Sequence, residues 1–191
     1  MGALRRLSRQ PAAEPAGHAV GQDRDLPDAI AKMHYEDCPG IPTDAAARVV
    51  SRAGSAKYPL SLNTAHPTNR LHSQLDNTPL REKYAVADRE AILIHPQDAQ
   101  PRGISGGDLV RAFNDRGQIP VGAVVSEDVR PGVVRISEGA WFDPADPAQP
   151  GSLCKNGNVN CLTFDIGSSS LAQGNCGQMA QLQIEKYRGR Y

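Results

Sequence analysis

Two segments rich in neutral polar side chains contain the residues best suited to binding chemistry. Residues 66–75 read His-Pro-Thr-Asn-Arg-Leu-His-Ser-Gln-Leu, and residues 171–178 read Leu-Ala-Gln-Gly-Asn-Cys-Gly-Gln. Their amides, hydroxyls and imidazoles can donate or accept hydrogen bonds without a fixed charge. Such segments favour a long polar ligand with several rings and phosphates, held by many hydrogen bonds rather than by one charge pair.

The first segment offers four candidate ligand contacts. His66 and His72 are an even number of residues apart, so an extended chain would present both on one face. An imidazole can donate to a heterocycle or a phosphate oxygen, although both could equally be surface or packing histidines. Ser73 and Gln74 suit the edge of a heterocycle, and their alternative role is a capped turn.

The remaining candidates lie toward the C-terminus. Asn160, in a Gly-Asn-Val-Asn loop, could read a heterocycle edge or form an Asx turn. Gly177 lets the backbone approach a ligand closely, and Gln178 beside it adds an amide. Without Gln178, Gly177 would read as an ordinary loop glycine.

Composition excludes several classes of protein. Lys+Arg and Asp+Glu both number 21, and aromatic residues make up 5%, so neither a basic surface nor stacking platforms for nucleic acid are expected. No apolar run approaches the ~20 residues of a membrane span. Four cysteines lack C-x-x-C spacing, which argues against a zinc ribbon or a thioredoxin-like site. Free thiols are expected, with a disulfide left open.

The elements that must position these residues are short. Residues 1–56 show little periodicity beyond a short helix near 26–34, and we expect an irregular or loosely docked segment there. Residues 57–191 are expected to form one mainly β domain with short helices, in which about six strands close into a barrel. The strands are predicted at residues 58–63, 91–94, 108–113, 119–125, 133–136, 162–164 and 182–185.

Three local features carry specific expectations. The continuous apolar run Ala91–Ile94 predicts a strand buried on both faces. Gly117 is expected to supply a positive φ to the hairpin turn at 114–117. Trp141 is expected to anchor its loop by packing, because an indole buries a large apolar area.

Many motifs in a fixed order carry a resemblance over residues 57–189. They read HPTNRLHSQL, LREKYAVA, IHPQDA, RGISGGDLVRAFNDRGQ, PGVVRISEGAWFDP, GNVNCLTFDIGSSSLAQGNCGQ and IEKY. Together they resemble the C-terminal domain of the dimethyl sulfoxide, trimethylamine N-oxide and biotin sulfoxide reductases. The resemblance implies a double-psi β-barrel that closes over bis(molybdopterin guanine dinucleotide) with molybdenum. By matching motif, it implies cofactor contacts at the following residues: His66, His72, Ser73, Gln74, Asn160, Gly177 and Gln178.

The resemblance also implies partners. Those enzymes are several times longer, and their serine ligand to molybdenum lies in an upstream domain that this chain lacks. We therefore expect upstream catalytic domains and an electron donor as partners, and no turnover by the chain alone. The reductases are usually periplasmic, but Arg5-Arg6 is followed by no apolar region, so no signal peptide is identified and a cytoplasmic location stays open.

A second reading of the sequence is a non-catalytic β-barrel interaction module, or the remnant of a truncated reductase gene. The scattered acidic residues form no nucleophile–base arrangement and no familiar metal-ligand spacing, so no catalytic or metal-binding residue is predicted. That pattern suits a domain that binds a cofactor while the reacting atom is held elsewhere.

Overall fold

The computed structural model describes residues 28–40, 56–175 and 179–189, and the chain divides into two compact units, Met1–Thr43 and Asp44–Tyr191. In the first unit, α1 (Asp28–Ala31) begins with an acidic residue, which suits the positive end of a helix. Gly40, with φ +82°, ends the described part of this unit, where an added Cβ would lie 2.8 Å from the Ala31 nitrogen. The predicted helix near 26–34 is therefore present as a single turn.

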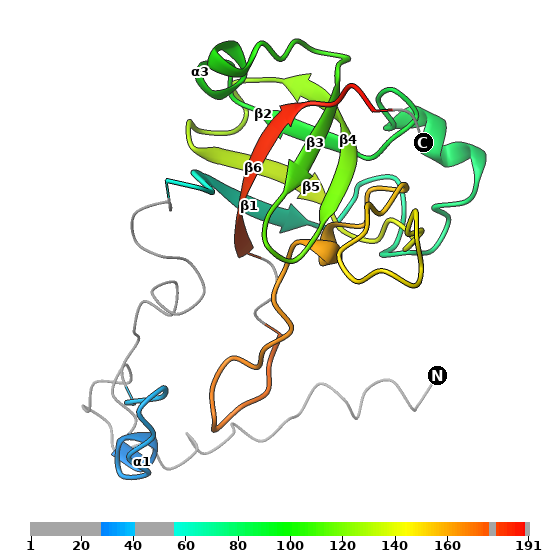
Figure 1. Ribbon diagram of the computed structural model, residues 1–191. Helices are drawn as coiled ribbons and strands as arrows, with labels where there is room; N and C mark the ends of the chain where they lie inside the picture. The colour runs from blue at the N-terminus through cyan, green and yellow to red at the C-terminus, as the bar shows by residue number, and fades with distance from the viewer. Residues whose placement is uncertain (1–27, 41–55, 176–178, 190–191) are drawn as a thin grey trace, which may run out of the picture. The chain divides into compact units, whose positions relative to one another are not determined.

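Six strands of the second unit close into a barrel in the order β1-β5-β2-β4-β3-β6 (Figure 1). Neighbours β1 and β5 are parallel, as are β2 and β4, while the other four pairs are antiparallel. These crossing connections make the domain a double-psi β-barrel, as the family resemblance implied, and the closed six-stranded ring agrees with the strand pattern. The strands are β1 (Leu60–Ala65), β2 (Ala91–Ile94), β3 (Leu109–Phe113), β4 (Gln118–Val125), β5 (Val133–Ser137) and β6 (Met179–Lys186).

Alternation of side chains fills the barrel. Inward residues such as Ile92, Val134 and Leu182 are almost fully buried, while their chain neighbours face outward. β2 follows this alternation, with Ala91 and Leu93 half-buried, so the prediction that both of its faces are buried was wrong. A closed ring pairs the backbone of every strand and leaves no edge.

Short helices and turns connect the strands. The His95 side chain accepts a hydrogen bond from the Gln97 N–H at the start of α3 (Pro96–Ala99), and η2 (Gln100–Arg102) ends at Gly103 in a left-handed conformation. Two further 3-10 helices are η1 (Pro79–Lys83) and η3 (Val159–Cys161). Among the described residues, no helix combines the length and the apolar character that crossing a membrane requires.

Two local expectations were wrong. The segment 162–164 forms no strand, because it follows η3 directly as an irregular stretch that buries only Leu162 in the core. Gly117 does not adopt a positive φ. The turn is held by Asn114, whose Oδ1 accepts from the Arg116 N–H, and a Cβ at Gly117 would meet the Cys161 carbonyl oxygen at 2.8 Å. Close approach, rather than backbone conformation, accounts for the glycine.

Candidate functional site

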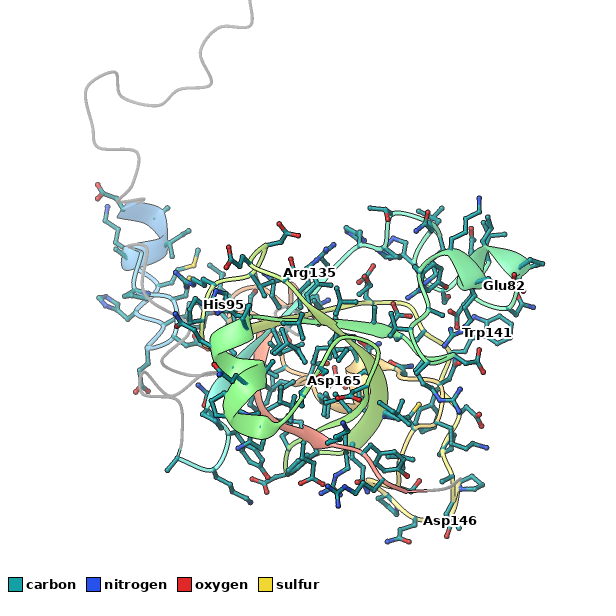
Figure 2. The ribbon with its side chains drawn as sticks, turned by 90° about the horizontal axis from the view of Figure 1, so that it is seen from above. Glu82, His95, Arg135, Trp141, Asp146 and Asp165 are labelled. Carbon is teal, nitrogen blue, oxygen red and sulfur yellow. The ribbon has the colours of Figure 1, made fainter. Side chains whose placement is uncertain are left out.

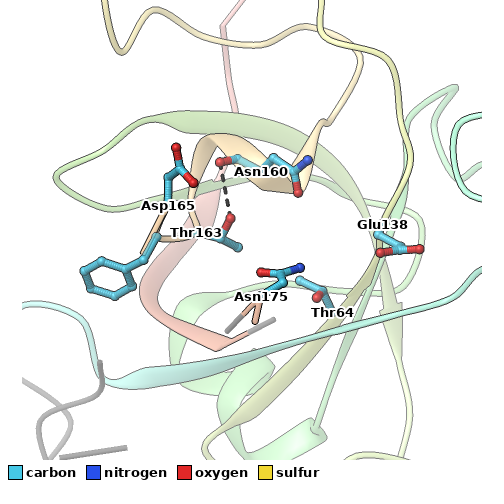
Figure 3. Close-up of a pocket in the computed structure, with 7 residues that line it drawn as sticks. Thr64, Glu138, Asn160, Thr163, Asp165 and Asn175 are labelled. Atoms are coloured by element: carbon cyan, nitrogen blue, oxygen red, sulfur yellow. Dashed lines mark hydrogen bonds between the residues drawn. The ribbon is translucent and has the colours of Figure 1, made fainter. Parts of the chain in front are cut away.

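A polar cavity of about 450 Å³ opens at one rim of the barrel (Figure 3). At this rim the parallel strands β1 and β5 end and the antiparallel β6 begins, as the pairings Ala65↔Ser137 and Asn63↔Met179 show. In the view from above, Asp165 projects onto the opening of the ring of strands and Trp141 lies outside it (Figure 2). The cavity is lined by Thr64, Glu138, Asn160, Thr163, Phe164, Asp165 and Asn175.

The strand register brings His66, His72 and Glu138 together. His66 follows the last residue of β1, Glu138 follows the last residue of β5, and the Glu138 N–H donates to the Ala65 carbonyl at 3.0 Å. The Nδ1 atoms of His66 and His72 lie 2.7 and 2.6 Å from Oε1 of Glu138. Their ring centroids are 4.9 Å apart. We call these three residues the His66–His72–Glu138 cluster; its carboxylate lines the cavity.

The two histidines meet for a different reason from the one predicted. Residues 66–74 form no strand, and His72 adopts φ +49°, a left-handed conformation that is uncommon outside glycine. The chain therefore turns back on itself, so that the two rings converge on one carboxylate. Strain of this kind persists where surrounding contacts hold it.

Arg70 provides those contacts from beneath. Its side chain is fully buried, with Nε donating to the His72 carbonyl at 3.1 Å and Nη2 to the Glu138 carbonyl at 2.5 Å. Gly139, with φ +93°, presses against the same place, since a Cβ there would lie 2.0 Å from the His72 carbonyl oxygen. One guanidinium thus joins the backbones of two cluster residues.

Two buried carboxylates neutralise Arg70. Its Nη1 lies 3.0 Å from Oε2 of Glu90 and 3.6 Å from Oδ1 of Asp76. Burial raises the pKa of Glu90, although the nearby Arg70 charge opposes the shift. Burial also opposes ionisation of Asp76, but hydrogen bonds from the Trp141 N–H and Asn156, together with the charge of Arg81, outweigh it and lower its pKa. A buried arginine is tolerated only with such partners.

The structure brings together some predicted site residues and separates others. The Asn160 side chain lines the cavity, while the Asx turn belongs to Asn158, whose Oδ1 accepts from the Asn160 N–H at 2.9 Å. Ser73 and Gln74 are exposed and are not among the cavity-lining residues. The hydrogen bonds described for this pair involve their backbone atoms. Gly177 and Gln178 lie outside the described residues.

Trp141 is fixed by hydrogen bonds rather than by burial. Its indole Nε1 donates to the Ser73 carbonyl at 2.7 Å and its backbone N–H to Asp76 at 3.0 Å, while about half of the residue stays exposed. The expectation of anchoring by packing was therefore wrong in its cause. Through Trp141, the Ser73 backbone is tied to the chain that follows Glu138.

The described cysteines carry no disulfide. Cys38, Cys154 and Cys161 are free thiols, as expected, and Cys176 lies outside the described residues. A hydrogen bond from Cys161 lowers the pKa of the Cys154 thiol, against the opposing effect of burial. The Asp143 N–H also donates to this sulfur at 3.3 Å.

The second unit is a closed double-psi barrel with a polar cavity at its rim. Residues 60–179 match the family described as the molydopterin dinucleotide binding domain. The chain belongs to this family.

The relatives agree with this assignment. The chain is 50% identical over 179 residues to a dimethyl sulfoxide/trimethylamine N-oxide reductase of Cereibacter sphaeroides, and 50% identical over 182 residues to trimethylamine-N-oxide reductase 1 of Escherichia coli K12. Both matches cover 94% of this chain and 22% of the relative, so the chain spans about a fifth of the length of these reductases. The predicted family resemblance is confirmed.

A solved structure shares the fold. Acetylene hydratase from Pelobacter acetylenicus matches with a TM-score of 0.58 and 17% sequence identity, covering 83% of this chain and 22% of that chain. Because the identity is low, this likeness supports the barrel architecture alone.

Several residues of the site were missed by sequence reasoning. Glu138, Arg70, Glu90 and Asp76 are charged residues scattered over the chain, and Glu138 is 66 residues from His72. Two signals could have found some of them. Arg70 lies inside the polar segment that was singled out, and Glu138 lies two residues after the predicted strand at 133–136.

Proposed function

We propose that this chain binds bis(molybdopterin guanine dinucleotide) as the C-terminal domain of a molybdenum reductase of S-oxides or N-oxides. The observation that carries the proposal is the rim cavity. There Asn160 and the carboxylate held by His66 and His72 lie together in a chain of the dinucleotide-binding family.

The chemistry of the cavity suits the heterocyclic parts of such a cofactor. Amides of Asn160 and Asn175, with the hydroxyl of Thr163, can each hydrogen bond to the edges of guanine or pterin rings. The Asp165 carboxylate can accept from ring N–H groups. None of the seven described lining residues is Lys or Arg, and two are acidic, so the pyrophosphate would lie outside this cavity.

The remaining predicted contacts are part of the same proposal. His66 and His72 would donate to ring or phosphate oxygens from the cavity mouth, where about two-thirds of each side chain is exposed. Ser73 and Gln74 would add contacts outside the cavity. Gly177 and Gln178, which follow the cavity residue Asn175 closely in the sequence, would supply backbone N–H groups and an amide.

The chemical step would belong to the assembled enzyme. The molybdenum of the bound cofactor supplies oxygen-atom transfer, and this chain positions the cofactor by hydrogen bonds to its rings. No residue of the chain is proposed to react with substrate. The preference between S-oxides and N-oxides would be set by other domains of the reductase.

Those other domains, with an electron donor, are the proposed partners. The exposed apolar side chains near the cluster give them a surface: Leu71 is 61% exposed and Leu75 47%. Trp141, hydrogen-bonded to Ser73, is half-exposed beside them. Exposed apolar groups of this kind commonly mark contacts between domains. The sequence resemblance to periplasmic reductases makes that compartment part of the proposal.

The proposal is tested by cofactor retention. The chain is purified from a host that makes the cofactor, then oxidised, and the released pterin fluorescence and guanine nucleotide are quantified. Asn160→Ala should lower the cofactor content at least about tenfold, because a buried hydrogen-bonding edge would lose its partner. Asn77→Ala, at an exposed asparagine that does not line the cavity, is the matched control and should retain it.

Absence of pterin and nucleotide from the purified chain, with no effect of the Asn160-equivalent substitution in the Escherichia coli relative, would contradict the proposal. Equal retention by Asn160→Ala and Asn77→Ala would contradict the assignment of the cavity. A stable complex with another protein and no pterin would instead support the interaction-module reading.

A further inference from the structure

We propose that the His66–His72–Glu138 cluster binds one divalent transition-metal ion of the Zn²⁺ type, through two imidazole nitrogens and one carboxylate oxygen. Among the residues that the structure describes, it is the one group of three such side chains whose ligand atoms all lie within 4.8 Å of one another. Two histidines and one glutamate are a ligand set that zinc sites with an open fourth position use.

The distances are close to those that a metal ion needs. Zn–N and Zn–O bonds of about 2.0–2.2 Å in a tetrahedral arrangement place neighbouring ligand atoms roughly 3.3 Å apart. The two Nδ1 atoms now lie 2.7 and 2.6 Å from the same carboxylate oxygen. Opening each contact by roughly 0.6 Å would therefore admit the ion. The exposed imidazoles, 70% and 61% accessible, can make that adjustment by rotating their side chains.

The backbone beneath the three ligands is already fixed. His66 and Glu138 follow paired residues of two parallel strands, so their Cα positions are set by the barrel. His72 is held by the Arg70 guanidinium, which also binds the Glu138 carbonyl, and by contact with Gly139. A site whose ligands are positioned before binding loses less free energy in ordering them.

Metal selectivity follows from the ligand types. Imidazole nitrogen suits Zn²⁺, Co²⁺ and Ni²⁺, whereas Ca²⁺ and Mg²⁺ require more oxygen ligands than this cluster offers. Only the deprotonated forms of imidazole and carboxylate bind a metal ion, so binding should weaken as pH falls. Water or a ligand atom would complete the coordination.

This inference does not rest on the proposed cofactor function. It uses the same imidazoles, however, so metal and cofactor would be alternative occupants of the cavity mouth. The test therefore uses the full chain purified without cofactor and reads out metal binding directly, and its outcome leaves the cofactor-retention experiment unaffected.

Zn²⁺ is titrated into the full chain by calorimetry, and Co²⁺ binding is followed by visible absorption, at neutral pH. We expect one ion per chain and no thiolate-to-metal charge-transfer band. His66→Gln, His72→Gln and Glu138→Gln should each weaken binding at least about 100-fold, more than the loss of an outer-shell partner costs. His34→Gln and Glu127→Gln, at exposed positions outside the cluster, are matched controls and should leave the affinity within about twofold.

A second measurement guards against misfolded variants. In the unmodified chain, Co²⁺ should broaden or shift the NMR signals of the His66 and His72 rings far more than those of His95, which follows β2 at the opposite end of the barrel. Undetectable binding, affinity that survives all three ligand substitutions, or a thiolate charge-transfer band that reveals a cysteine site would each overturn the proposal.

Discussion

Arg70 contacts two clusters of polar side chains, one buried and one exposed to solvent. Below it lies a buried network in which Glu90 and Asp76 neutralise the guanidinium, with side chains at most 2% exposed. Above it lies the His66–His72–Glu138 cluster, whose imidazoles are mostly exposed. At this rim, buried charges hold the backbone while the polar side chains of the cluster face solvent. The buried Arg70–Glu90–Asp76 network fixes the backbone through the carbonyls of His72 and Glu138, and the imidazoles bound to Glu138 are exposed.

The largest expected effect on stability comes from removing Arg70 from the buried network. Arg70→Met should lower the free energy of unfolding by about 3–5 kcal/mol, because Glu90 would remain buried without its ion-pair partner and two carbonyls would lose their donor. Urea denaturation measures the loss. Arg70→Lys should recover only part of it, since an ammonium cannot reach both carboxylates and both carbonyls in the same fork geometry. A loss below about 1 kcal/mol for Arg70→Met would mean that the network does not support the rim.

A somewhat smaller effect should follow from crowding the junction. Gly139→Ala combines a left-handed backbone with a Cβ 2.0 Å from the His72 carbonyl oxygen, and should cost about 3 kcal/mol. Gly107→Ala is the matched control, because Gly107 has φ +86° but nothing within 4 Å of an added Cβ. The control should cost only the conformational part, about 1–2 kcal/mol. Equal decreases in melting temperature for the two variants would show that the close approach of Gly139 to the His72 carbonyl does not contribute to stability.

Low pH should weaken the buried Arg70–Glu90–Asp76 network by protonating Asp76. Its folded-state pKa lies below the ordinary value of 3.8, so its stabilisation is complete above that pH and is lost as the pH falls through the folded-state pKa. Asp76→Asn should lower stability at pH 7 and flatten the decline below about pH 4. Unfolding midpoints measured from pH 7 to pH 2 test this, and a variant with an unchanged acid decline would assign that decline to other carboxylates.

The smallest effect should come from the exposed cluster. Without a ligand, Glu138→Gln or His66→Gln should change the free energy of unfolding by no more than about 1 kcal/mol, because exposed ion pairs contribute little. The same denaturation assay serves for both. A loss of unfolding free energy as large as that for Arg70→Met would show that the exposed cluster stabilises the fold as much as the buried network does.

The barrel could be predicted from the sequence because its signal is local. Alternating apolar residues marked β1, and hairpin residues marked the turn between β3 and β4. Leu162 misled the strand prediction, since one deeply buried residue after a 3-10 helix looks like part of a strand when only hydrophobicity is read.

The site could be predicted only in part. His66, His72 and Asn160 were identified through the family's motifs, and the structure gathers them at one rim. The two buried carboxylates beside Arg70 could not be identified, because nothing in the sequence distinguishes Glu90 or Asp76 from solvated acids. Their importance arises from the tertiary pairing with Arg70, which periodicity does not encode.

The ring of six strands has a consequence for how such domains diversify. Since every strand of the described barrel is paired on both sides, the ring offers no free strand edge to another chain when a connecting loop changes. Insertions or exchanges at the rim can therefore alter what is held there without inviting aggregation. Evolution can change the residues of the rim loops while the strands of the barrel stay the same.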